Sequence, residues 1–387
     1  MQNFSYFNPT RILFGKGQIA SIAGHIPAGS KVLVTYGGGS IFKNGIYLQV
    51  VTALKDFECI EFGGIEPNPR YETLMQAVEI ARREGVDFIL AVGGGSVADG
   101  SKFIAAAAKF GGADPWDLLA KHAPVKAALP LGVVLTLPAT GSESNTFAVI
   151  SRDSTGEKLG FGSEHCYPAF AVLDPEATFS LPVRQVANGI VDAFVHTMEQ
   201  YMTYPANAPL QDRFAEGILH TLIEQGPLAL TRPDDYEVRA NVMWSATMAL
   251  NGLIGCGVPQ DWATHMIGHE ITAEFGLDHA QTLAVVLPGV LRSQREVKRG
   301  KLLQYAERIW GLSGGDEEAR IDAAIDRTEA FFESLGVKTR LSGYGVEGTE
   351  AAPVKISTRL RSHGFAQLGE HGRITPEVVE SILAERV

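Results

Sequence analysis

The chain has 387 residues, 45% of them hydrophobic and 20% charged, which is the composition of a globular protein too long for one hydrophobic core. The formal net charge of −11 argues against nucleic acid or an anionic membrane surface as a standing partner. The three cysteines, Cys59, Cys166 and Cys256, have no CxxC spacing, so they predict neither a zinc ribbon nor a disulfide framework. Because no apolar run is long enough for a signal peptide or a membrane span, the sequence predicts a cytoplasmic protein.

The first half of the chain alternates strand-like and helix-like segments. Apolar, β-rich runs at residues 31–40, 87–96 and 131–144 each end in small residues. Apolar residues recur at helical spacing between the first two runs, and an alanine-rich helix is expected after the second. This alternation predicts a parallel sheet wrapped by helices, and we expect a Rossmann-like α/β domain that binds a dinucleotide over residues 1–180.

The strand signal fades from about residue 181 onward. Long stretches with 3.6-residue periodicity replace it, at residues 181–202, 211–230, 236–255 and 320–336. We therefore expect an all-helical, metal-binding domain over residues 181–387, and the whole chain should have a dehydroquinate synthase-like architecture. The boundary is expected within residues 170–182, where two prolines bracket a polar turn.

Glycine-rich turns follow two of the predicted strands. Glycines after a parallel strand let the backbone turn sharply, so that N–H groups of the next helix can face a phosphate. The GGGS segment at 93–96 is therefore a candidate pyrophosphate cradle, while the order Ser101-Lys102 excludes a P-loop. The GGGS segment at 37–40 offers no acidic residue to a ribose 2′-hydroxyl, which leaves room for the 2′-phosphate of NADP, and an aspartate at Gly39 should repel that phosphate. A plain flexible turn is the alternative for both segments.

Two segments that read as helices carry imidazoles and a carboxylate. Asp192 and His196 lie four residues apart in the first segment. His265 and His269 lie four apart in the second, and His279 follows shortly after. Residues four apart share a helix face, so each pair can reach one point, and their apolar neighbours place them beside the core, where they need a partner. The set predicts a divalent transition metal, with surface hydrogen bonds or helix-end charges as the alternative.

Taken together, these segments resemble the iron-containing (group III) alcohol dehydrogenases, and in particular their YqhD-like branch of NADPH-dependent aldehyde reductases. The resemblance runs essentially end to end. It is carried by FILAVGGGSVADGSKFIAAAA, LTLPATGSESN, RQVANGIVDAFVHTMEQY and VPQDWATHMIGHEITA. The C-terminal hundred residues match only loosely. One departure is His279-Ala280, where many members of the family have His-Gly.

The resemblance implies a homodimeric NADP(H) oxidoreductase that interconverts short-chain aldehydes and primary alcohols, mainly as a broad-specificity aldehyde reductase. It implies metal ligands at Asp192, His196, His265 and His279. Zn²⁺ is favoured at this site, although Fe²⁺, Ni²⁺ or Co²⁺ suit the same donors. The resemblance also implies that His269 and Asp99 are catalytic, with His269 near the nicotinamide and substrate. The implied cofactor contacts are Gly37, Gly38, Gly39, Ser40, Gly93, Gly94, Gly95, Ser96, Asp99, Thr136, Thr140, Asn145 and Lys158.

Because the ligands are expected on helices and the cofactor on the sheet, we expect the reaction in a cleft between the two domains. There the metal would polarise the carbonyl while NADPH supplies a hydride. A dehydroquinate synthase-like or sugar-phosphate enzyme of the same fold is the alternative function. Such an enzyme needs basic residues around its metal to hold phosphate, and neither 190–204 nor 260–275 contains Lys or Arg. The sequence therefore favours the dehydrogenase.

Overall fold

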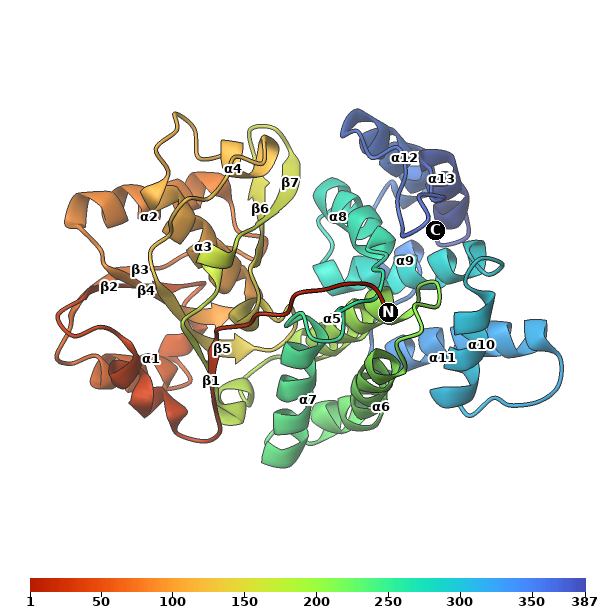
Figure 1. Ribbon diagram of the computed structural model, residues 1–387, viewed down its shortest axis with the longest axis horizontal. Helices are drawn as coiled ribbons and strands as arrows, with labels where there is room; N and C mark the ends of the chain where they lie inside the picture. Colours follow the sequence, from red (N-terminus) through yellow and green to blue (C-terminus); the bar gives the residue numbers. More distant parts are fainter. The chain divides into compact units, whose positions relative to one another are not determined.

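The computed structural model describes all residues 1–387, and the chain divides into two units (Figure 1). The sheet unit comprises Phe7–Leu181 and Pro233–Asn251, and the helical unit comprises Met1–Tyr6, Pro182–Arg232 and Gly252–Val387. The main division thus falls one residue after the expected boundary at residue 180, but neither unit is one continuous stretch.

Helix α7 (Tyr236–Ala249) belongs to the sheet unit, whereas the sequence places it in the helical domain. Its side chains explain the difference. Met243 is fully buried in the hydrophobic core of the sheet unit. The Thr247 hydroxyl donates a hydrogen bond of 2.6 Å to the buried carboxylate of Glu143. Helical periodicity predicts the helix itself but carries no information about which core the helix joins.

A six-stranded sheet in the order β1-β8-β5-β4-β2-β3 forms the centre of the sheet unit. Every neighbouring pair is parallel, which confirms the predicted parallel sheet. Its strands are β1 (Arg11–Phe14), β2 (Lys31–Tyr36), β3 (Glu58–Phe62), β4 (Phe88–Gly94), β5 (Leu131–Leu137) and β8 (Phe170–Leu173). A separate antiparallel hairpin consists of β6 (Phe147–Arg152) and β7 (Glu157–Gly162).

Helices cover both faces of this sheet. Successive residues of a strand pack into different hydrophobic cores on the two faces of the sheet. In β2, Val32 belongs to the core that includes η1 and α1, and Leu33 belongs to the core that includes α2 and α3. Burial on both faces explains why the strands read as continuous apolar runs. The helices of the unit besides α7 are α1 (Ile46–Ala53), α2 (Tyr71–Glu84), α3 (Gly95–Lys109) and α4 (Asp117–Ala120), with 3-10 turns η1 (Gln18–His25), η2 (Ser40–Phe42), η3 (Ser142–Ser144), η4 (Glu164–Cys166) and η5 (Pro175–Thr178).

The helical unit is built around α5 (Val183–Tyr201), in which every residue from Val186 to Tyr201 is buried. A helix buried on all sides is a core helix, and α6 and α9 pack against it. The other helices of the unit are α6 (Pro209–Thr231), α8 (Ala263–Phe275), α9 (His279–Ser293), α10 (Arg299–Arg308), α11 (Glu317–Ser334), α12 (Ala352–Ser362) and α13 (Pro376–Ala384), with η6 (Leu341–Tyr344) and η7 (Thr349–Ala351). None of these helices combines the length and the apolar character that a membrane crossing requires.

Candidate functional site

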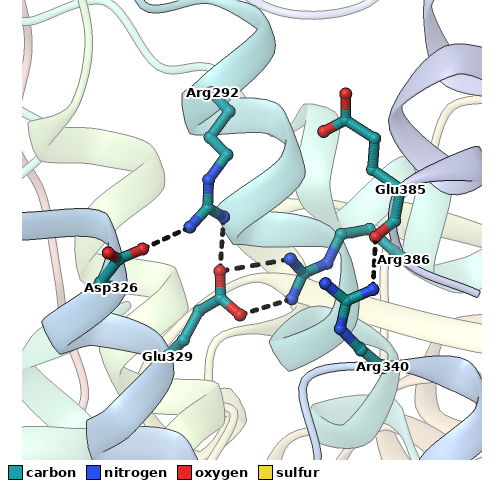
Figure 2. Close-up of a pocket in the computed structure, with 6 residues that line it drawn as sticks. All are labelled: Arg292, Asp326, Glu329, Arg340, Glu385 and Arg386. Atoms are coloured by element: carbon teal, nitrogen blue, oxygen red, sulfur yellow. Dashed lines mark hydrogen bonds and ion pairs between the residues drawn. The ribbon is translucent and has the colours of Figure 1, made fainter. Parts of the chain in front are cut away.

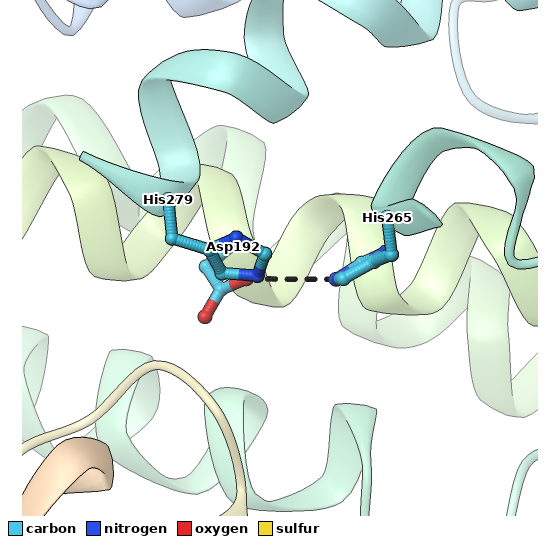
Figure 3. A group of neighbouring side chains, drawn as sticks. All are labelled: Asp192, His265 and His279. Atoms are coloured by element: carbon cyan, nitrogen blue, oxygen red, sulfur yellow. Dashed lines mark ion pairs between the residues drawn. The ribbon is translucent and has the colours of Figure 1, made fainter. Parts of the chain in front are cut away.

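Three helices of the helical unit bring the predicted ligands together. Asp192 comes from the buried helix α5, His265 from the first turn of α8, and His279 is the first residue of α9. One ligand atom from each of the three lies within 4.8 Å of the others. Figure 3 shows both imidazoles directed toward the carboxylate, with His279 Nε2 at 3.6 Å and His265 Nε2 at 3.8 Å from Asp192 Oδ1.

His196, the fourth predicted ligand, lies beside this cluster rather than within it. Its Nδ1 is 3.7 Å from Oδ1 of Asp192, the residue one turn earlier on α5. Its ring stacks on the ring of His265, with the two centroids 4.6 Å apart. The structure therefore brings three of the four predicted ligands within mutual reach and places the fourth against two of them.

The start of α9, and with it His279, is fixed by Asp278. The Asp278 side chain caps the helix in a reciprocal arrangement with Gln281. The same carboxylate accepts hydrogen bonds from two side chains of α5, Arg184 Nη1 at 2.8 Å and Asn188 Nδ2 at 2.7 Å. Because Asp278 directly precedes His279, these bonds set the position of the ligand relative to Asp192.

The donor atoms around Asp192 suit a metal ion. Asp192 Oδ1, His196 Nδ1 and His265 Nε2 are buried and have no hydrogen-bond partner. Buried polar atoms are normally hydrogen-bonded, so three such atoms around one point indicate a missing partner. A carboxylate and imidazoles are donors that divalent transition metals accept. The residues present therefore fit the metal that the sequence predicts.

Asp192 and His196 have the protonation states that metal binding needs, whereas His265 does not. Burial disfavours the ionised form of Asp192, but the neighbouring imidazoles outweigh it and hold the pKa of this carboxyl below its usual range. Burial lowers the pKa of His196 to about 4, so its imidazole is neutral at pH 7. Burial also opposes the charged form of His265, yet the carboxylates of Glu199 and Asp192 raise its pKa to about 9. Since ligands bind deprotonated, metal binding must release a proton from His265.

Sequence reasoning missed Glu199. Its carboxylate accepts a hydrogen bond from His265 Nδ1, and its other oxygen accepts one from Thr264 N at 2.6 Å. Glu199 is only 3% exposed, so this carboxylate interacts with protein groups instead of water. It lies seven residues after Asp192, two turns along the same face of α5, and that spacing is the signal that could have revealed it.

His269 lies one turn after His265 on α8 and is half-buried. Its ring centroid is 5.1 Å from that of His279 and 6.3 Å from that of His265. It does not belong to the group of three residues whose ligand atoms approach one another. The structure thus places His269 next to the candidate ligands, and its catalytic role remains a prediction.

The candidate pyrophosphate cradle lies where β4 runs into α3. Gly94 is the N-cap of α3 and Gly95 is its first residue, so the free N–H groups of the helix start at this turn. Close packing demands glycine here. A Cβ at Gly93 would lie 2.5 Å from Val97 Cγ2, and one at Gly95 would lie 2.3 Å from Thr140 Oγ1. The side chains of Val97 and Thr140 thus account for these two glycines, and the start of α3 is the feature that suits a dinucleotide phosphate.

Other predicted cofactor residues lie at the C-terminal ends of β2 and β5, the two strands that flank β4. The turn at 37–40 follows β2, Thr136 is near the end of β5, and Thr140 comes just after it. Because neighbouring parallel strands end at the same edge, these segments lie near the cradle. Gly39 has a φ of +85°, whereas Gly38 is exposed and a Cβ there would meet no atom within 4 Å.

Asp99 and Asn145 are engaged in hydrogen bonds within the sheet unit. The Asp99 carboxylate accepts hydrogen bonds from Ser142 Oγ at 2.5 Å and Val149 N at 2.9 Å, and burial raises its pKa. Asn145 Oδ1 accepts a hydrogen bond of 3.0 Å from Lys102 Nζ. These bonds connect α3 to residues 142–149, so both side chains contribute to the structure of the sheet unit. Asp99 also belongs to a different unit from the candidate ligands.

Lys102 is a second residue that the sequence did not reveal. It is fully buried, and burial lowers its pKa to about 8. Its ammonium group donates hydrogen bonds to Ser142 Oγ at 2.9 Å and to Phe147 O at 2.7 Å, besides the bond to Asn145. The feature of the sequence that could have indicated this buried lysine is its place directly before the apolar run FIAAAA of α3. Lys158, the last predicted cofactor residue, lies on β7 and donates to Asn68 Oδ1 at 2.8 Å.

A cavity of about 700 Å³ in the helical unit contains none of the predicted site residues (Figure 2). It is lined by Arg292, Asp326, Glu329, Arg340, Glu385 and Arg386. The Glu329 carboxylate lies between Arg292 and Arg386 and pairs with both. Arg292 also pairs with Asp326, and Arg340 donates to Glu385 O at 2.8 Å. Because the lining groups bind one another, this cluster links helices.

Comparisons with known proteins support the resemblance seen in the motifs. The family model described as "Iron-containing alcohol dehydrogenase" matches residues 9–175. The model described as "Fe-containing alcohol dehydrogenase family, C-terminal" matches residues 186–380. Together they span both units of the structure.

Individual relatives cover nearly the whole chain. It is 61% identical over 384 residues to the NADPH-dependent aldehyde reductase YqhD of Escherichia coli (strain K12), with 99% of each protein covered. It is 43% identical over 352 residues to NADP-dependent alcohol dehydrogenase 3 of Entamoeba histolytica, covering 89% of this chain and 90% of that protein. The crystal structure of E. coli K-12 YqhD matches with a TM-score of 0.97 and 59% identity, over 100% of this chain and 99% of the other. The chain belongs to the iron-containing alcohol dehydrogenase family.

Proposed function

We propose that this protein is a metal-dependent NADP(H) oxidoreductase that interconverts short-chain aldehydes and primary alcohols, acting mainly as a broad-specificity aldehyde reductase. The observation that carries the proposal is the cluster of buried Asp192, buried His265 and half-buried His279, with His196 against it. The similarity to a relative named as an NADPH-dependent aldehyde reductase supports the cofactor and the substrate class.

The residues divide the work between the two units. Asp192, His196, His265 and His279 would hold the metal, and the glycines at 93–95 with the start of α3 would bind the pyrophosphate. When bound, the metal supplies Lewis acidity that polarises a carbonyl, and the nicotinamide supplies a hydride. A ring nitrogen of His269 would pass a proton to the oxygen of the product alcohol.

One carboxylate and three imidazoles form a four-donor set of the kind that Zn²⁺ accepts, so we favour Zn²⁺, with Fe²⁺, Ni²⁺ or Co²⁺ as substitutes. Metal analysis of the purified protein, combined with NADPH oxidation across a panel of short unbranched aldehydes, tests the proposal. We expect bound divalent metal and turnover that a chelator removes while the fold remains. Protein that binds no added metal and oxidises no NADPH with any aldehyde would contradict it.

The proposed preference for NADP(H) rests on the turn at 37–40. We expect NADPH to exceed NADH in kcat/KM by about tenfold or more, because no acidic side chain there repels the 2′-phosphate. Gly39→Asp is a poor test, since any side chain at its φ of +85° is strained. Gly38→Asp places a carboxylate in open space at the same turn and should shift the preference toward NADH.

Gly38→Asn is the matched control, because it has nearly the same shape without the charge and should leave the ratio of the two kcat/KM values almost unchanged. The measurement is kcat/KM for both cofactors with one aldehyde. Equal use of NADPH and NADH by the wild type, and no change in Gly38→Asp, would contradict the assignment of this turn.

We also infer a homodimer in the reducing cytoplasm. Large aromatic side chains are exposed on the sheet unit: Phe7 is 60%, Phe14 38% and Trp244 42% exposed. Phe14 belongs to the edge strand β1 and packs against Trp244 with a ring distance of 5.9 Å. Exposed aromatic side chains, such as this pair at a sheet edge, are typical of a protein interface. Light scattering should give about twice the chain mass of 41.6 kDa. The three free thiols suit a reducing compartment.

A further inference from the structure

We infer that Glu199 is a positioning residue for the metal: its carboxylate accepts a hydrogen bond from His265 Nδ1 and fixes the orientation of the ring, so that Nε2 is the nitrogen that faces the other ligands and binds the metal. The inference rests on the proposed metal site and adds to it a residue outside the ligand set. Glu199 would touch neither metal nor substrate and would act only through His265.

The Glu199 carboxylate binds α8 through both of its oxygens. One oxygen accepts a hydrogen bond from His265 Nδ1. The other oxygen accepts one from the backbone N–H of Thr264 at 2.6 Å and a longer one from that of His265 at 3.4 Å. A single buried side chain of α5 therefore contacts both the backbone and the ring of the ligand on α8.

The backbone N–H groups at the start of α8 need Glu199 as an acceptor. Helix α8 begins at Ala263 after Trp262, which has a left-handed backbone and provides no side-chain cap. The N–H groups of the first turn have no partner within the helix. Asp261 Oδ1 accepts a hydrogen bond from the first of them, Ala263 N, at 2.9 Å, and Glu199 satisfies the next two. The N–H groups of Thr264 and His265 thus hold the carboxylate in place, and the carboxylate in turn orients the His265 ring.

The contact with Glu199 decides which nitrogen of the His265 imidazole can bind a metal. A histidine binds metal through an unprotonated nitrogen, and a carboxylate that accepts from one ring nitrogen leaves the other to carry the lone pair. Here Nδ1 donates to Glu199, so Nε2 carries the lone pair in the neutral ring. His265 Nε2 is the buried atom without a hydrogen-bond partner that lies 3.8 Å from Asp192 Oδ1. The contact with Glu199 therefore presents the nitrogen that faces the ligand cluster.

Glu199→Gln tests this role with almost no change of shape. An amide has one accepting oxygen, and the N–H of Thr264 requires an acceptor. The NH₂ group would then face His265 Nδ1 and favour the tautomer whose proton is on Nε2, toward the metal. We expect the affinity for Zn²⁺ and Co²⁺, measured by competition with a chromophoric chelator, to fall by about 10- to 100-fold. The visible absorption spectrum of the Co²⁺-loaded variant should also change, because the ligand is displaced.

Glu270→Gln is the matched control. Glu270 is a buried carboxylate on α8, the helix that carries His265, and it accepts hydrogen bonds from His363 Nδ1 at 2.7 Å and Arg359 Nε at 2.8 Å. It thus removes a comparable His–carboxylate contact outside the ligand set. If Glu199 only joined α5 to α8, both variants would lose thermal stability and keep the metal affinity of the wild type. Our inference predicts that only Glu199→Gln loses affinity and alters the Co²⁺ spectrum.

A double-mutant cycle completes the test. In a His265→Ala background, Glu199→Gln should change the metal affinity no further, because Glu199 acts through His265. If Glu199→Gln does not fold, Glu199→Asp keeps the charge but shortens the reach, and it should show the same loss. Wild-type affinity and an unchanged spectrum in a folded Glu199 variant would overturn the inference. Wild-type protein that binds no metal would instead reject the metal site, and this inference with it.

Discussion

Replacing His265 with alanine should remove most of the bound metal and lower kcat/KM for aldehyde reduction by about 10²- to 10³-fold or more, the range found when an electrostatic stabiliser of the reacting oxygen is lost. His265 offers the cluster a buried Nε2 that no hydrogen bond occupies. Its loss removes one of the proposed donors and also leaves the Glu199 carboxylate without its ring partner. Metal content by elemental analysis and turnover with NADPH are the two measurements.

The unpaired carboxylate brings a second effect that must be separated from metal loss. The Glu199 carboxylate keeps its backbone donors but loses the ring N–H, and leaving one oxygen of a buried charged group without a partner costs about 1–3 kcal/mol or more, so the melting temperature should also fall. His220→Ala is a suitable control, since His220 lies in the same unit and its Nε2 bonds to Arg308 O at 2.8 Å. That variant should keep its metal and its turnover. Full metal content and normal turnover in folded His265→Ala would show that the ligand assignment is wrong.

His269→Ala should keep the metal but slow turnover by about tenfold to a thousandfold, the range typical of a lost proton relay or positioning group. His269 lies one turn beyond His265, with its ring 5.1 Å from that of His279, so it is next to the cluster without belonging to it. Its removal should therefore leave the donor set intact. The measurements are metal content, kcat and melting temperature on one purified preparation.

The competing explanation is a histidine that only supports the packing of α8. In that case the melting temperature of His269→Ala would fall while turnover per folded molecule barely changed. Loss of metal from this variant would contradict both explanations, because it would make His269 a ligand. The comparison of kcat with melting temperature thus separates a chemical role from a structural one.

The sheet and the ligand pairs could be predicted because both depend on local periodicity. Strands buried on both faces read as apolar runs, and glycines mark their C-terminal ends, as at 93–95. Asp192 and His196 share a helix face by spacing alone. The placement of α7 could not be predicted, because the burial of Met243 depends on contacts with residues far away in the sequence.

The residues that support the site were harder to find for a physical reason. Rules of residue burial place Lys and Glu at the surface, so Lys102 and Glu199 attract no notice in a sequence. Both are buried because their partners come from distant segments: residues 142–147 for Lys102, and the start of α8 for Glu199. Gly39 shows the same limit, since its left-handed backbone becomes visible only in the structure.

The insertion of α7 into the sheet unit has a consequence for synthesis of the chain. A ribosome that has released residues up to Leu181 has released all six strands of the sheet, but not the helix that covers Glu143. Until residues 233–251 emerge, the Glu143 carboxylate lacks the Thr247 hydroxyl and the core lacks Met243. The nascent sheet unit therefore exposes part of its apolar surface while α5 and α6 of the other unit are synthesised. Chaperone binding during translation should be concentrated in this interval.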